Sequence, residues 1–139
     1  MATLTKFYVF VEDLAEKVHN LGSDTLRFML ANTAPSLSNT QRTDITEIAA
    51  GNGYVANGQS VTVTSSAQSS GLYTLIASDV SWTATPSAMA AFRYAVLYND
   101  TSTNDKLIGY IDFGYSITLS AGQTFTIDLD QTSGLLYMS

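Results

Sequence analysis

The chain has 139 residues, enough for one ordinary domain with a buried core. Charged residues make up only 13% of it, about half the usual fraction, and the net charge is −6. Its six basic residues are scattered singly, which argues against direct binding of nucleic acid. The absence of cysteine excludes disulfides and thiolate sites, and a single histidine is a poor basis for a zinc site.

Membrane insertion and secretion are not expected. No apolar run approaches the roughly 18 residues of a membrane span. The apolar run Phe7–Val11 is too short for the core of a signal peptide, and acidic residues follow it directly. We therefore expect the protein to remain in the cytoplasm of the cell that makes it.

The first 22 residues predict an N-terminal arm followed by the one helix of the chain. Apolar side chains recur there at steps of three and four residues, as on one face of a helix. This stripe consists of Phe7, Phe10, Val11, Leu14, Val18 and Leu21. Glu12, Asp13 and Glu16 are expected to face away from it. Gly22 is suited to end the helix, because the residue after the last turn often has a left-handed backbone.

Beyond Gly22 the apolar period changes to two, which is typical of strands. The first strands are predicted in residues 25–32, 60–68, 71–77 and 79–84. Asn57-Gly58 is a strong turn signal before the second of them.

The clearest hairpin joins FRYAVLYN to LIGYIDFG through the polar loop Asn99–Lys106. Pairing Tyr98 with Leu107 places Arg93 opposite Asp112, and opposite charges stabilise such a ladder. We therefore predict a structural pair between Arg93 and Asp112.

The same register leaves Leu97, Ile108 and Tyr110 on the second face of the hairpin. The helix, another sheet or another subunit must cover these apolar side chains. The three residues are therefore the candidate subunit interface.

A second hairpin is predicted in residues 116–130, with its turn at Ser120–Gln123, and a last short strand in residues 134–139. Seven to nine short strands behind one helix predict a mainly β fold. We expect an antiparallel β-sandwich, jelly-roll or immunoglobulin-like, that forms a single domain over residues 1–139.

The only histidine lies in VHNLGSD, where Ser23 and Asp24 follow it closely. A Ser-His-Asp triad needs three converging side chains, and these normally come from separate elements. The end of a helix explains each residue more simply: His19 lies near the negative end of the dipole, and Ser23 and Asp24 form the turn. No catalytic residue is predicted.

Three other motifs are interpreted as loops. GNGYVA (Gly51–Ala56) lacks the following helix that a dinucleotide motif requires, and DFG (Asp112–Gly114) lacks the other kinase motifs. DTSTND (Asp100–Asp105) alternates oxygen donors as a calcium loop does, without the expected glycine and glutamate. We favour a polar hairpin loop there, with calcium binding left open, and we predict no metal or cofactor.

Several stretches between about Phe7 and Leu129, nearly the whole chain, carry a resemblance to a known family, with the segments in the same order. The stretches are FVEDLAEKVHNLGSDTLRFMLANTAPSLSNT with DITEIAAGNGY, and later FRYAVLYNDT, LIGYIDFG and SITLSAGQTFTIDL. They resemble a family of small structural proteins of tailed bacteriophages. The resemblance implies a non-enzymatic virion component, assembled in the host cytoplasm, and we expect one that decorates or cements the outside of the capsid.

Such a protein would be a homo-oligomer, expected to be a trimer, bound across neighbouring copies of the major capsid protein. The alternative is a tail, fibre or baseplate module. In that case Trp82 or the tyrosines would stack on host sugars. Neither interpretation calls for nucleic acid, a membrane or a cofactor.

Overall fold

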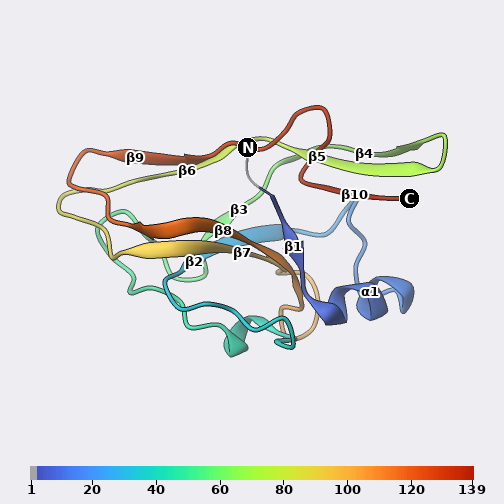
Figure 1. Cartoon of the computed structure of the whole chain (residues 1–139), viewed down its shortest axis with the longest axis horizontal. Coiled ribbons are helices and arrows are strands. Elements are labelled where there is room, and N and C mark those ends of the chain that lie inside the picture. Colours follow the sequence, from blue (N-terminus) through green and yellow to red (C-terminus); the bar gives the residue numbers. More distant parts are fainter. Residues whose placement is uncertain (1–2) are drawn as a thin grey trace.

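The computed structural model describes residues 3–139 as short antiparallel strands with one short helix near the N-terminus (Figure 1). The mainly β fold with an N-terminal helix is therefore confirmed. No helix in the described residues is both long and apolar enough to cross a membrane. In chain order the elements are β1 (Thr5–Lys6), α1 (Tyr8–Ala15), β2 (Leu26–Ala31), the 3-10 helix η1 (Arg42–Asp44), β3 (Gln59–Ser60), β4 (Val63–Ser69), β5 (Leu72–Ala77), β6 (Val80–Thr83), β7 (Phe92–Asn99), β8 (Leu107–Ile117), β9 (Thr124–Ile127) and β10 (Leu136–Met138).

Two layers of strands enclose the main core (Figure 1). One layer is the five-stranded sheet β1-β8-β7-β2-β3. The other contains the sheets β10-β5-β4 and β6-β9, which adjoin because β5 leads almost directly into β6. The side chains between the layers include Trp82, Phe28, Phe92 and Phe10, all at most 1% exposed.

A second, smaller core covers the other face of the five-stranded sheet. Figure 1 shows η1 and its flanking loops lying under β2 and β7, on the side away from β5 and β6. Ile45 from this segment and Phe7 from the start of α1 pack there against Met29, Val96 and Leu107. Burial on both faces explains why β2 and β7 are apolar at nearly every position instead of at alternate ones.

The helix is shorter than predicted, so the proposed stop at Gly22 is wrong. α1 ends at Ala15, and Lys17 takes the left-handed conformation with φ 68°. The N–H of Val18 donates to the carbonyl of Asp13 at 2.8 Å, the bond that closes a left-handed helix end. A helix continued to Leu21 would rise about 9 Å past Ala15, whereas the turn returns Leu21 to the main core.

Two residues within α1 also face the opposite way from the prediction. Val11 is 66% exposed although it was predicted in the apolar stripe. Asp13 was predicted on the outer face and is buried instead, with 6% of its surface exposed.

The β7–β8 hairpin starts as predicted and then shifts by one residue. Tyr98 pairs with Leu107, but Leu97 pairs with Gly109 and Tyr94 with Asp112. One extra residue in β8, at Ile108, forms a bulge that displaces every later pair of the predicted register.

Burial of both faces of the hairpin overturns most of the candidate subunit interface. Leu97 and Ile108 are fully buried in the main core, so they cannot contact another subunit. Tyr110 is half-buried and packs against Phe7 in the second core, with ring centres 5.4 Å apart. The chain itself covers the face that was expected to need a partner.

The predicted hairpin in residues 116–130 is also wrong. β9 pairs with β6, where Phe125 lies opposite Trp82, while Ile117 pairs with Phe92 of β7. The turn at Ser120–Gln123 therefore carries the chain from one layer to the other. The alternation of apolar residues is the same for either partner, so the pattern does not distinguish them.

The Asn57-Gly58 turn packs directly on β2. Asn57 and Gly58 have φ values of 75° and 78°. A methyl group on Gly58 would collide with the carbonyl oxygen of Phe28. Both the backbone conformation and the space therefore require glycine at this position.

The covering segment is the part of the chain between β2 and β3, residues 32–58, which lies over the second face of the sheet. We predict that Gly58→Ala lowers the free energy of unfolding by about 3 kcal/mol or more, since this segment must then lift off β2. Gly122→Ala is the matched control, because Gly122 has φ 88° but open space around the added methyl group. It should cost only about 1 kcal/mol. Urea denaturation of both variants checks this, and equal losses would contradict it.

Candidate functional site

One side chain from a distant strand organises the corner between α1 and β2. Asn99, the last residue of β7, donates through Nδ2 to Nδ1 of His19 at 3.0 Å and to Oδ2 of Asp24 at 2.7 Å. Its Oδ1 accepts the backbone N–H groups of Thr101 and Ser102 at 2.9 and 3.2 Å. Since Asn99 is fully buried, it joins the corner to the β7–β8 loop inside the protein.

His19 is neutral in this arrangement. Because Oδ1 of Asn99 accepts two N–H groups, its NH₂ group must face His19, and Nδ1 of His19 accepts. The ring proton then lies on Nε2, which is buried and has no hydrogen-bond partner in the described part of the chain. Burial lowers the pKa of His19; Asp13 and Asp24 oppose this shift, and Lys106 adds to it.

Ser23 takes no part in the cluster. It is exposed, and its backbone N–H donates to the carbonyl of Asn20 in the turn. Among the described residues no hydroxyl hydrogen-bonds either ring nitrogen of His19, as a nucleophile and its base require. His19 and Asp24 nevertheless converge on Asn99, although both come from the same short corner of the chain.

A groove of about 520 Å³ runs beside this corner. Lys17, His19 and Asp24 line it on one side, and Ser66 and Tyr73 of the β4–β5 hairpin line it on the other. The hydroxyls of Ser66 and Tyr73 hydrogen-bond each other at 2.9 Å. The groove is open and its walls mix apolar, acidic and basic groups, so no one ligand chemistry stands out.

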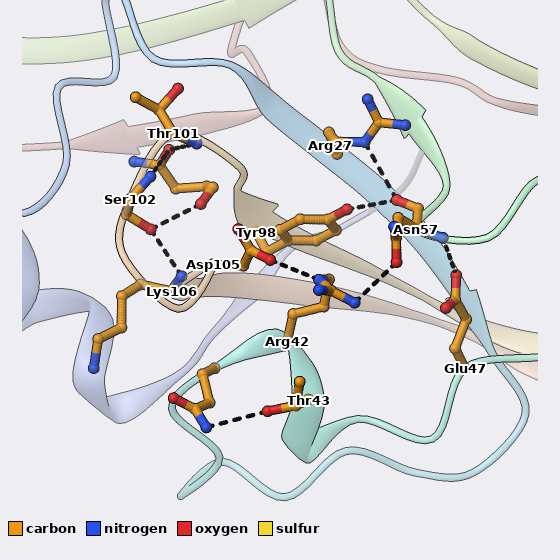
Figure 2. Close-up of polar contacts among 12 residues, drawn as sticks. Arg27, Arg42, Thr43, Glu47, Asn57, Tyr98, Thr101, Ser102, Asp105 and Lys106 are labelled. Atoms are coloured by element: carbon orange, nitrogen blue, oxygen red, sulfur yellow. Dashed lines mark hydrogen bonds and ion pairs between the residues drawn. The ribbon is translucent and has the colours of Figure 1, made fainter.

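A second polar cluster fastens the covering segment to the five-stranded sheet (Figure 2). Nε of Arg42 pairs with Oδ2 of Asp105 at 2.8 Å, and Nη1 donates to Oδ1 of Asn57 at 2.8 Å. The backbone N–H of Asn57 donates to Oε2 of Glu47 at 2.6 Å, and its carbonyl accepts the hydroxyl of Tyr98 at 2.6 Å. The segment between β2 and β3 is thereby tied to β7 and to the loop after it.

The tyrosines of this cluster are neutral hydrogen-bond donors. Burial raises the pKa of Tyr98 to about 12. Burial also raises the pKa of Tyr54, whose hydroxyl donates to Oε2 of Glu47 and accepts the backbone N–H of Leu30. The carboxylate of Asp105 raises the pKa of Arg42. Arg27 also belongs to the cluster, because it donates to the carbonyls of Asn57 and Gly58. Two arginines and two carboxylates then balance, and the cluster acts as a structural clasp.

Arg93 and Asp112 form an ion pair even though they are not directly opposite in the ladder. Nε of Arg93 lies 2.8 Å from Oδ1 of Asp112, and Nη2 lies 3.1 Å from Oδ2. The pair forms beside a second register shift between Phe92 and Tyr94. Oδ1 of Asp112 also accepts the N–H of Gly114. The DFG triplet is therefore part of this surface contact.

The loop Asp100–Asp105 is held by the protein's own groups. Oγ of Ser102 donates to the carbonyl of Asn99 and accepts the N–H of Lys106, both at 2.8 Å (Figure 2). Asp105 is paired with Arg42. Within residues 3–139 no group of three or more His, Cys, Asp or Glu residues is arranged to hold a metal ion. The loop's hydrogen bonds thus explain its polar sequence.

Two other sequence features occupy structural positions. In GNGYVA the backbone groups of Gly51 and Tyr54 hydrogen-bond each other at 2.7 and 3.1 Å, and a strand follows instead of a helix. Trp82 is 1% exposed in the main core, so it is not available to stack on a sugar.

Several large apolar side chains remain on the surface. They are Tyr8, Val11, Val55, Leu72, Tyr115 and Tyr137. Tyr8 and Val11 are 69% and 66% exposed and lie one turn apart on α1. These two residues form the α1 outer face, the candidate contact surface; of the two, the sequence pattern had assigned only Val11 to the interior.

We predict that stability falls as the pH is lowered from 7.5 to 5.5. The pKa of His19 lies below its unfolded value of about 6.5, so the unfolded chain takes up a proton there that the folded chain does not. His19→Gln removes this uptake and should show a smaller loss over the same range. Urea denaturation at both pH values measures it. An equal or larger loss in His19→Gln would refute the assignment.

Comparisons with models of protein families, with curated proteins and with solved structures found no match for this chain. The roles given to His19, Asn99 and Arg42 therefore rest on the contacts described above.

Proposed function

We propose that this protein is a non-enzymatic structural component of a bacteriophage virion, and that it decorates or cements the outer surface of the head. Its binding partner would be the major capsid protein. The observation that carries the proposal is the exposed pair Tyr8 and Val11 on α1, taken together with the sequence resemblance. Assembly would take place in the cytoplasm of the bacterial host.

The arrangement of the polar groups supports a structural role. The one histidine is buried against Asn99, and Arg42, Glu47 and Asp105 serve to attach loops to the sheet. The surface also carries exposed large apolar side chains, and two of them, Tyr8 and Val11, are neighbours on α1. A contact that covered this pair would remove apolar area from water.

The proposed mechanism is mass action. A protein that binds only the assembled shell adds buried area there and not to free subunits, so it stabilises the shell in proportion to its occupancy. The α1 outer face is a suitable contact, because the helix is fastened at both ends. Phe7 precedes it in the second core, and the Asn99 cluster follows it.

The location can be tested on purified virions of the phage that encodes this chain, by electron microscopy with gold-labelled antibody. We expect label over the head. Heads stripped of the protein should release DNA at a lower temperature, and adding the protein back should restore the original temperature. Label confined to the tail would support the tail, fibre or baseplate alternative, and unlabelled virions would contradict both.

We also predict that the double variant Tyr8→Ser, Val11→Ser binds stripped heads at least about tenfold more weakly. The two side chains would lose about 1–2 kcal/mol each of burial in the contact. Val55→Ser is the control, because Val55 is 70% exposed but lies on the covering segment instead of α1. Sedimentation of heads with each variant gives the affinities. Equal binding by both variants would show that the α1 outer face is not the contact.

A further inference from the structure

β4 is the longest edge strand in the described part of the chain. It lies at one side of the sheet β10-β5-β4 and has seven residues, whereas β1 and β3, at the edges of the large sheet, have two each. Six of its seven residues are exposed. Figure 1 shows the β4–β5 hairpin reaching the end of the molecule. Its outer edge is therefore open along most of its length.

This edge lacks the features that usually prevent edge-to-edge pairing. Natural edge strands carry lysine, proline or inward charges, or are very short. β4 reads VTSSAQS, and no charged residue occurs anywhere between Glu47 and Asp79. Its bulge lies at the start, between Val63 and Ser65, and leaves the rest of the strand regular.

The hairpin turn determines which backbone groups point outward. Ser69 pairs with Leu72 across the two-residue turn Ser70-Gly71, whose φ values are 50° and 85°. The closing pair of such a turn is hydrogen-bonded, and bonded pairs then alternate along the ladder. The N–H and C=O groups of Ser66 and Gln68 therefore point away from β5.

We propose that β4 pairs with β4 of a second copy of this chain, antiparallel about a two-fold axis at Ala67. Ser66 of each copy would then lie opposite Gln68 of the other and exchange two backbone hydrogen bonds with it. The two Ala67 side chains would meet directly at the axis, where small side chains allow the closest approach.

A second copy suits this edge because the strand is complementary to itself. The chain as a whole carries a net charge of −6, which opposes self-association elsewhere on the surface, but β4 adds no repulsion. A two-fold contact uses the same patch on both copies, so the assembly stops at a dimer with no patch left for a third chain. A trimer would need a head-to-tail contact between two different edges. The inference does not depend on the virion role, since it concerns the isolated protein.

The test is sedimentation equilibrium of the purified chain and two charge variants. Ala67→Lys and Ala67→Glu each place like charges opposite each other at the axis, so each should raise the dimer dissociation constant at least about tenfold. An equimolar mixture should recover dimers, because Lys then faces Glu. Recovery in the mixture also shows that both variants are folded.

Ala121→Lys is the matched control, since it makes the same change in an exposed turn outside β4 and should leave the dimer intact. Hydrogen exchange gives a second readout: the amides of Ser66 and Gln68 should exchange more slowly as the protein concentration rises. A wild-type monomer at all concentrations would overturn the proposal. So would a trimer, or a dimer that Ala67→Lys leaves unchanged.

Discussion

Burial of the five-stranded sheet on both faces is the constraint on which the rest of this structure depends. β2 and β7 are apolar at nearly every position, so neither face can be left in water. The sheets β10-β5-β4 and β6-β9 cover one face of the five-stranded sheet. The segment between β2 and β3 has no strand of its own to cover the other side, and polar contacts must fix it there. Arg42, Asn57 and Tyr98 supply those contacts.

Three of the six basic residues of the chain hold segments of the fold together. A chain with only six basic residues uses Arg42 and Arg27 to fasten the covering segment, and Arg93 to brace the β7–β8 hairpin. The long segment from Ile48 to Ser78 carries no charge at all. The edge strand β4 lies within this uncharged segment.

The sequence predicts the number and type of elements well, because the apolar period distinguishes helix from strand. The sequence-based prediction fails where a single residue determines the direction of the backbone or the register of a strand pair. Lys17, a residue with no special tendency to adopt a left-handed backbone, ends the helix. A single bulge at Ile108 places Tyr110 on the opposite face of the hairpin from Leu97 and Ile108. The pairing of β9 with β6 was missed because the alternation of apolar residues shows which face of a strand is buried but does not show which strand lies beside it.

The candidate site was predictable only in part. The pairing of Arg93 with Asp112 follows from opposite charges within one hairpin, and it tolerates an error in register because both side chains are long or exposed. The role of Asn99 does not follow from the sequence. It lies 75 residues beyond Asp24, and a loop asparagine before polar residues gives no sign of a buried contact.

The strand order also determines when this chain can fold. β2 pairs with β7, β6 with β9, and β5 with β10, so each sheet joins residues that are far apart along the chain. Such non-local pairing is slow, because long loops must close before any contact forms. On the ribosome, β2 can pair only with the short strand β3 until β7 has emerged. β1 must wait longer still, because its partner β8 follows β7. The five-stranded sheet is therefore completed only when most of the chain has left the ribosome.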